Sequence, residues 1–298
     1  MKRIPLSVVI AFISSINIFS QSISFSGYGE VFLNRINDTT TVDMPHVLMA
    51  ADITLSDKWS FEGEIEYIES LDITQLWVQR SFSDMLNLKL GKITVPLGFS
   101  NTADNPMDHF TAYLPKCEEL VLPYDWNQVG ISLCGENDAW QYELLGLING
   151  DKLAIASSVN NSSIENLRLG IGAYYGGTYD PEASDNLFFC GFDYEYKNAH
   201  FVSRGNIIYS DLEEALCGGI ELGYDMLSHR VSDNNTSTQL FLFSRYDACR
   251  AVDYTRLTVG INYLPLSSIN LKAEYNHNIN PSLHGFAISL GIDFSIFD

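Results

Sequence analysis

The chain has 298 residues and a formal charge of −20 at pH 7, from 37 acidic and 17 basic side chains. Such an acidic chain is a poor partner for nucleic acid, because phosphates select basic surfaces. With 46% apolar residues and a mean hydropathy of +0.01, the composition suits either a β-barrel with one lipid-facing and one water-facing side or a soluble β-sandwich.

Residues 1–20 have the features of a secretory signal peptide. Lys2 and Arg3 precede a mostly apolar run, Ile4–Phe19, and Ser20 is a small residue at the expected cleavage point. An uncleaved anchor helix is the alternative, but the run is shorter than a membrane span and is interrupted by polar residues and a proline. We therefore predict an exported mature chain, residues 21–298, whose charge is −22 once the two basic residues are removed (−20 − 2).

Segments that alternate between apolar and polar residues follow one another from residue 22 to the end, and none is long and apolar enough for a membrane helix. The plainest is Trp59–Tyr67, in which Glu62, Glu64 and Glu66 share one face. Three carboxylates on one strand face require water, which the lumen of a barrel supplies. The same alternation predicts strands over residues 47–55, 86–90, 129–133, 167–175, 188–196, 257–263 and 269–275.

Tight and long connections alternate along the chain, as periplasmic turns and outer loops do in bacterial barrels. The long ones are Asn34–Pro45, Val95–Asp125 and Gly176–Asp185. The alternation requires a weak strand over Lys152–Asn160, which brings the count to 16, whereas the connection Leu227–Ser237 falls on the side of the short turns. We therefore predict one domain, an all-β, transmembrane antiparallel up-and-down β-barrel with both termini periplasmic.

The last segment, Gly285–Asp298, has the pattern of a closing strand. Every second residue from Phe286 to Ile296 is apolar, and the residues between them are mostly small or polar. Such a strand lies between two different media, and we expect it to pair with the first strand, Ser22–Asn34. Aromatic residues near the predicted strand ends suit interfacial girdles; they are Trp59, Tyr67, Phe82, Trp126, Trp140, Tyr196, Tyr209 and Tyr263.

The connection Val95–Asp125 is the one long excursion, and connections of this length are usually functional or disordered. Its prolines and aromatic residues favour an ordered loop, which we expect to fold into the barrel mouth and narrow the pore. A surface loop lying outside is the alternative. The charged and titratable residues of this candidate constriction are Asp104, Asp108, His109, Lys116, Glu118, Glu119 and Asp125.

Four basic residues, Arg80, Arg204, Arg245 and Lys272, lie on predicted polar strand faces and are expected on the lumen wall with the three glutamates of Trp59–Tyr67. Set against those carboxylates, the cations would create a transverse field across the pore. Alternatively, they form structural ion pairs that tie the wall together.

Short segments spread over most of the mature chain carry a family resemblance. They are Gly91-Lys92, Pro96-Leu97-Gly98, Pro106, Glu119, Leu122-Pro123, Trp126, Gly130, Gly135, Tyr142, Asn149-Gly150, Phe241–Asp247, Thr258–Tyr263 and Lys272–Tyr275. Together they resemble the phosphate-selective porin O and P family. The resemblance implies a sixteen-stranded outer-membrane porin, often trimeric, with an inward constriction loop. Phosphate selectivity in that family depends on a pore rich in lysine and arginine, and the acidic loop of this chain departs from that pattern.

We therefore predict an outer-membrane porin that forms a water-filled passive diffusion channel for small hydrophilic solutes or ions. Its partners would be outer-membrane lipid and, if the resemblance extends to assembly, two further copies in a homotrimer. Selectivity follows rings of fixed charge, so an acidic pore predicts a preference for cations. A poorly conducting structural or adhesive barrel and a secreted soluble β-protein are the alternatives.

Patterns for catalysis, cofactors and metals are weak in this sequence. The six histidines are dispersed and there is no G-x-S-x-G motif, so we predict no enzyme, no cofactor and no metal site. The cysteines Cys117, Cys134, Cys190, Cys217 and Cys249 are odd in number and widely spaced. Their spacing allows one disulfide but predicts no particular pair.

Overall fold

The computed structural model of the protein describes residues 22–36, 39–43, 47–67, 70–99, 101, 105, 107–123, 125–179, 186–227, 238–280 and 282–296. The predicted signal peptide, Asp104, residues 228–237 of the predicted connection Leu227–Ser237 and the last two residues lie outside this part.

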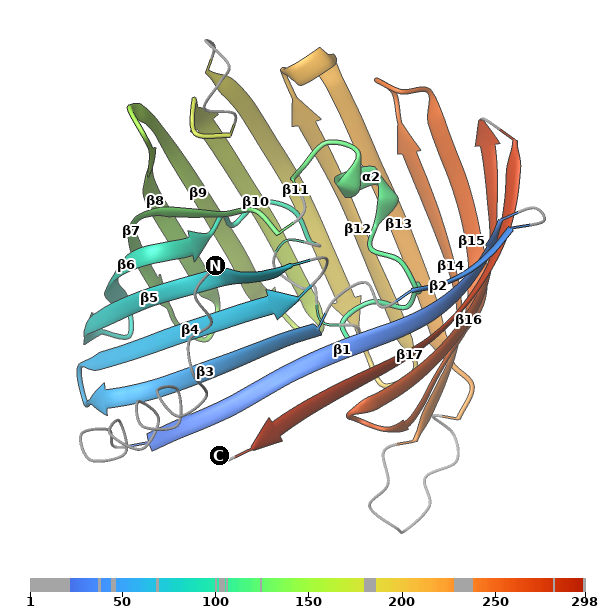
Figure 1. Ribbon diagram of the computed structural model, residues 1–298, viewed down its shortest axis with the longest axis horizontal. Helices are drawn as coiled ribbons and strands as arrows, with labels where there is room; N and C mark the ends of the chain where they lie inside the picture. The colour runs from blue at the N-terminus through green and yellow to red at the C-terminus, as the bar shows by residue number, and fades with distance from the viewer. Residues whose placement is uncertain are drawn as a thin grey trace.

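One antiparallel sheet contains the seventeen strands of the described residues, and it closes on itself where β1 pairs with β17 (Figure 1). In chain order the strands are β1 (Ser22–Ile36), β2 (Thr39–Asp43), β3 (Val47–Ser56), β4 (Trp59–Tyr67), β5 (Leu71–Ser83), β6 (Leu86–Thr94), β7 (Asn127–Glu136), β8 (Trp140–Asn149), β9 (Lys152–Ile164), β10 (Leu167–Gly176), β11 (Leu187–Lys197), β12 (Phe201–Ser210), β13 (Ala215–Asp225), β14 (Gln239–Cys249), β15 (Tyr254–Leu266), β16 (Ile269–Asn280) and β17 (Leu283–Ile296). The start of β1 pairs with β3 and its end with β2, so β2 and β3 share one position in the wall. The predicted closed barrel of sixteen strands (17 − 1) is confirmed.

The first hairpin differs from the long loop predicted over Asn34–Pro45. β1 runs to Ile36, which pairs in register with Thr39 at the start of β2, so two residues separate the paired ends of the strands. The segment Thr39–Val42 lacks a clear alternation of apolar and polar residues, but its β-branched side chains favour extended backbone. The prediction of a long loop here is wrong for that reason.

Elsewhere in the described part of the chain, the connections follow the predicted alternation. The weak strand expected over Lys152–Asn160 is present as β9, and the long connection Gly176–Asp185 leads from β10 to β11. Within the described ranges, short helices occur in two connections, α2 (Lys116–Glu119) and η1 (Leu212–Glu214). Among the described residues, no helix is both long and apolar enough to cross a membrane.

The alternating pattern of the strands separates an exposed outer face from a covered inner face. In β17, Phe286 and Ile296 on the outer face are 43% and 49% exposed, whereas Ala287 and Ser289 on the inner face are buried. The outer side chains are apolar, so they suit contact with hydrocarbon, and the polar side chains turn to the lumen.

The inside of the barrel also contains an apolar core, because the long connection between β6 and β7 folds into it beside β12 and β13 (Figure 1). The predicted inward path of Val95–Asp125 is thereby confirmed. Trp126, expected in an interfacial girdle, is 3% exposed inside the barrel, so that expectation is wrong. The loop side of the buried cluster includes Val95, Leu97, Cys117, Val121, Leu122 and Trp126, and the wall side includes Leu145, Leu147, Ala156, Tyr174, Phe189, Ile208, Cys217 and Cys249.

Candidate functional site: the constriction loop and the lumen wall

The constriction loop, Val95–Asp125, is held against one side of the wall by backbone N–H groups that donate to two buried carboxylates. Phe110 N lies 3.3 Å from Glu221 Oε1 on β13, and Ala112 N lies 2.7 Å from Glu274 Oε2 on β16. Both glutamates are almost completely buried. Because a buried carboxylate needs donors or cations around it, these two contacts stabilise the loop and the wall together.

Arg204 and Arg245 are two of the predicted lumen-wall cations, and the structure pairs both with carboxylates. Arg204 Nε lies 2.6 Å from Glu195 Oε2, and its Nη1 lies 3.4 Å from Glu221 Oε2. Arg245 Nη2 lies 2.9 Å from Asp247 Oδ1. Both arginines are buried, so they belong to the packed wall rather than to open lumen.

Lys272, the third predicted cation on this side, is 1% exposed and reaches the constriction loop. Its Nζ donates to the carbonyl oxygen of Thr111 at 2.9 Å and lies 3.7 Å from Glu30 Oε1. His109 Nδ1 lies 3.4 Å from the same Nζ and 2.8 Å from the Thr111 oxygen. The predicted constriction residue His109 therefore belongs to the contact between loop and wall.

Glu118 of α2 is a second anchor within the loop. It is fully buried, accepts a hydrogen bond from Phe99 N at 2.8 Å, and accepts another from Asn206 Nδ2 on β12. The sequence predicted Glu118 on the pore surface. In the structure its carboxylate instead links α2 to the start of the loop and to β12.

The other predicted loop residues lie nearer the surface. Lys116 and Glu119 form a partly exposed ion pair of 2.9 Å, three residues apart on α2. Asp108 is exposed and lines the lumen cavity. Asp125 accepts a hydrogen bond from Asn127 Nδ2 at the start of β7. Of the described acidic loop residues, Asp108 is the one that faces the cavity.

The opposite side of the wall, formed by β3 to β5, carries an acidic group. Glu62 pairs in register with Asp52 on β3. Glu64 accepts hydrogen bonds from Thr74 Oγ1 at 2.5 Å and from Gln75 Nε2 at 3.3 Å. Among the ion pairs of the described residues, none includes Asp52, Glu62 or Glu64. We name these three residues the acidic wall; the third predicted glutamate of β4, at position 66, is buried.

Sequence reasoning missed several residues of the site. Asp52 is the single acid on its strand face, so no charge pattern indicates a role for it. Its position in the alternation does place it on the polar face of the strand. Arg256 Nη2 lies 3.4 Å from Glu274, and the apolar alternation that starts at Leu257 gives no sign of a buried cation at the residue before it. Glu221 had no acidic neighbour at a spacing of two. The partners of an isolated charge of this kind can be assigned only when the register of the neighbouring strands is known.

A cavity of about 940 Å³ remains in the lumen. The constriction loop bounds it through Pro96–Phe99 and Asp108, and β5 to β12 line the rest together with the turn residues Asp57 and Lys58. Its polar lining includes Gln79, Lys89, Glu143, Asn160, Arg168 and Asp193. The size and polarity suit water and small hydrophilic solutes.

Arg80, the fourth predicted lumen cation, lies on the outer face instead. It pairs in register with Trp59, which is 41% exposed, while its chain neighbours Gln79 and Ser81 line the cavity. The prediction is wrong because the β4–β5 ladder is irregular between Glu64 and the residue after it. An extra residue in a strand inverts the alternation beyond it.

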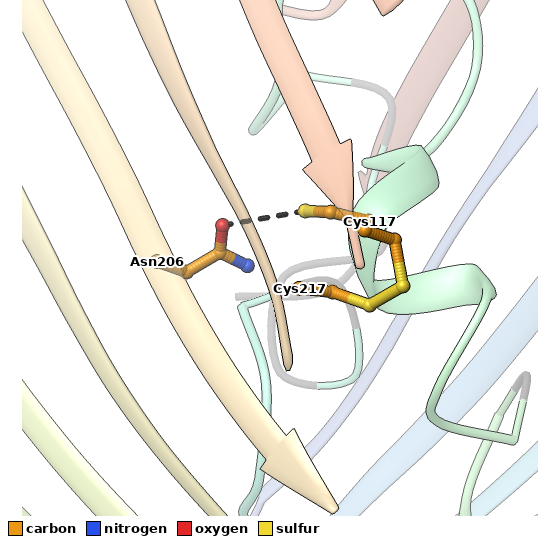
Figure 2. The surroundings of a disulfide bond; sticks show 4 residues. Cys117, Asn206 and Cys217 are labelled. Atoms are coloured by element: carbon orange, nitrogen blue, oxygen red, sulfur yellow. Dashed lines mark hydrogen bonds between the residues drawn. A yellow bond between two sulfur atoms is a disulfide. The ribbon is translucent and has the colours of Figure 1, made fainter. Parts of the chain in front are cut away.

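A disulfide joins Cys217 and Cys249, which face each other on β13 and β14 (Figure 2). The sequence had left the pairing open. Cys117 of the loop lies beside them as a free thiol and donates to Asn206 Oδ1 at 3.5 Å. Burial, and after it the negative charge of Asp247, raises the pKa of the Cys117 thiol well above its usual range. This thiol therefore stays protonated and weakly nucleophilic at neutral pH.

Thiol counting is expected to follow this arrangement. Iodoacetamide should label three cysteines in the unfolded, unreduced protein and all five after reduction. In the folded protein, Cys134 should react because it lines the cavity, whereas buried Cys117 should not. Intact-mass and peptide mass spectrometry measure both results. Five labels without reduction would contradict the disulfide.

The chain matches no model of a known protein family. It is 20% identical to an uncharacterized protein of Aquifex aeolicus (strain VF5), over 86% of this chain and 75% of that protein. Solved structures of outer-membrane barrels are similar in fold.

A loop L8 deletion mutant of OmpT, an outer-membrane protein of Vibrio cholerae, has a TM-score of 0.65 at 13% identity, covering 92% of this chain and 99% of that one. Pseudomonas putida OprB at low pH has a TM-score of 0.63 at 9% identity, with 96% of each chain covered. A mutant of the Rh. blastica porin has a TM-score of 0.58 at 11% identity, covering 91% and 100%. The chain thus has the barrel fold of outer-membrane porins, and this likeness does not single out the phosphate-selective O and P family.

Proposed function

We propose that this protein is an outer-membrane porin that forms a water-filled passive diffusion channel for small hydrophilic solutes and prefers cations. The distribution of charge in the lumen carries this proposal. The buried cations Arg204, Arg245 and Lys272 are matched by carboxylates, whereas the acidic wall belongs to none of the ion pairs among the described residues. Lys89 is a fixed cation that acts on Glu62, so mobile cations are the counterions for the remaining charge of the acidic wall.

The fold supports the channel part of the proposal. A wall of sixteen strands encloses a lumen wide enough for water, and the constriction loop narrows it while a cavity of about 940 Å³ remains. The apolar outer face supports a membrane location. The signal-peptide features of residues 1–20 support export with cleavage, and the V. cholerae OmpT structure solved in a trimer form supports a homotrimer for this chain.

Reversal potentials in a planar bilayer test the proposal. The purified mature protein is inserted under a KCl gradient, and we expect a potential of the sign produced by K⁺ passing more readily than Cl⁻. Anion preference would overturn the cation assignment. Heat-modifiable mobility on a gel first establishes that the inserted protein is the folded barrel and separates it from a secreted soluble β-protein.

A poorly conducting structural or adhesive barrel is the second candidate. The apolar cluster between the constriction loop and the wall favours it, because that cluster fills part of the lumen with side chains such as Leu145, Leu147 and Phe189. Absence of single-channel conductance from correctly folded protein would select this candidate. The absence of enzymatic activity stays a prediction in either case.

A further inference from the structure

The outer face of the barrel has an unusual selection of charges. In the described strands, the outward positions carry no Asp or Glu, although the chain has 37 acidic residues. They do carry three cations, each opposite an exposed apolar residue on the neighbouring strand: Arg35 opposite Phe286, Arg80 opposite Trp59 and Lys92 opposite Leu76. Lipid-facing Arg and Lys cost more than Asp and Glu at the same depth, so insertion cost alone would not select cations. A negatively charged partner outside the barrel would select cations at these positions.

Two of these cations have contacts within the chain. Lys92 Nζ donates to the carbonyl oxygen of Ile73 at 2.6 Å, beside the irregular part of the β4–β5 ladder. Arg35 also interacts within the chain. Arg80 differs from both, because none of the hydrogen bonds or ion pairs of the described residues includes its guanidinium group. Five N–H donors of a permanently charged group are therefore directed outward.

Two aromatic rings hold the Arg80 guanidinium. Its Cζ lies 5.3 Å from the centre of the Trp59 ring and 5.1 Å from the centre of the Phe82 ring. Trp59 is the first residue of β4 and Phe82 is the penultimate residue of β5, so the three side chains lie at the rim that bears the short turns, where Phe82 also borders the lumen cavity. Exposed aromatic residues at a barrel rim mark the depth of the lipid headgroups.

We propose that Arg80, with Trp59 and Phe82, binds the phosphate of an anionic phospholipid in the leaflet at this rim. The proposal rests on the membrane location given under the proposed function. A planar guanidinium matches two phosphate oxygens in a bidentate contact, and the rings fix its direction and contact the glycerol and upper acyl chain. A second copy of the chain is a poorer occupant, because the described outward strand positions offer it no carboxylate.

Native mass spectrometry of the full folded protein tests the site. The protein in detergent is titrated with phosphatidylglycerol, and in separate arms with phosphatidylcholine and with inorganic phosphate. We expect Arg80→Gln to weaken phosphatidylglycerol binding about tenfold, the scale of a charge-assisted hydrogen bond, and Arg80→Lys to retain part of it. Trp59→Leu should weaken it less than Arg80→Gln.

Lys58→Gln is the matched control. It removes the same charge one residue from Trp59, but Lys58 lines the lumen cavity, so lipid binding should stay at the wild-type level. Equal phosphatidylglycerol binding by wild type and Arg80→Gln would overturn the proposal. An equal loss of lipid binding in Lys58→Gln would show that net charge alone causes the effect. Displacement of the lipid by millimolar phosphate would indicate a site for free anions. Either result would also overturn the proposal.

The result is separable from channel function. Heat-modifiable mobility shows whether each variant is folded, and lipid binding is measured without any conductance. A barrel that binds the lipid but conducts nothing would support the Arg80 site while rejecting the porin proposal. Normal conductance of a variant that has lost lipid binding would support both.

Discussion

Replacing the acidic wall by its amides, in the triple variant Asp52→Asn, Glu62→Gln, Glu64→Gln, is expected to remove most of the cation preference of the channel. Each carboxylate stabilises a monovalent cation at about 4 Å by ~1 kcal/mol even at the dielectric constant of water. This energy corresponds to roughly a fivefold enrichment of the cation beside one carboxylate. We therefore expect the K⁺ to Cl⁻ permeability ratio, measured from the reversal potential in a KCl gradient, to fall at least fivefold.

A second triple variant provides the control for charge. Asp57→Asn, Asp84→Asn, Glu136→Gln removes three carboxylates that line the lumen cavity and lie exposed at the short turns. Salt screens exposed charges over about 8 Å at physiological ionic strength, so this variant should change the ratio much less. If the two triple variants shifted the reversal potential equally, the acidic wall would not be the selectivity element.

Removing the side chain of Phe110 is expected to release the constriction loop and raise single-channel conductance. The Phe110 ring is 4% exposed, and its centre lies 4.8 Å from that of Phe241 and 5.8 Å from that of Phe243. Phe→Ala changes in such an environment cost about 3–5 kcal/mol. Because the ring connects a loop to the wall rather than one strand to another, the loss of this packing energy should detach the loop and leave the barrel folded. Conductance recordings of Phe110→Ala should show larger and noisier openings.

Two further variants test whether packing of the ring is the cause. Gly223→Val disrupts the same contact from the wall side, because a Cβ atom at Gly223 would lie 2.3 Å from Phe110 Cε2. This variant should therefore raise conductance as well. Lys116→Gln with Glu119→Gln removes a partly exposed ion pair on the same loop, and such pairs contribute only about 0–1 kcal/mol. That variant should conduct like wild type. Unchanged conductance in folded Phe110→Ala would show that the loop does not limit the pore.

The fold class could be predicted from the sequence because lipid and lumen impose opposite polarity on successive strand residues. Trp59–Tyr67 and Phe286–Ile296 show this alternation clearly, and the structure keeps it. The first hairpin was missed because Thr39–Val42 has no such alternation and its extended conformation depends on pairing with β1. Parity of the connections recovered β9, a segment too weak to be assigned by its own pattern.

The site was predictable in outline only. Prolines and aromatic residues indicated that the loop is ordered, but its contacts join residues far apart in the chain. Phe110 and Glu221 are 111 positions apart, and Ala112 and Glu274 are 162 apart. Arg80 and Arg204 looked equivalent in the sequence, yet one extra residue in the β4–β5 ladder places Arg80 on the outer face. Arg204 instead faces inward and is buried against Glu195.

The closed barrel, its acidic interior and one loop long enough to enter it follow from the amino-acid sequence alone, because these properties depend on local alternation and composition. Which charges are matched depends on the three-dimensional fold. Strand register and the path of the loop bring carboxylates to Arg204, Arg245 and Lys272 and leave Asp52, Glu62 and Glu64 outside the ion pairs of the described residues. Ion pairing acts over a few ångströms, and sequence separation carries no information about distances on that scale between strands.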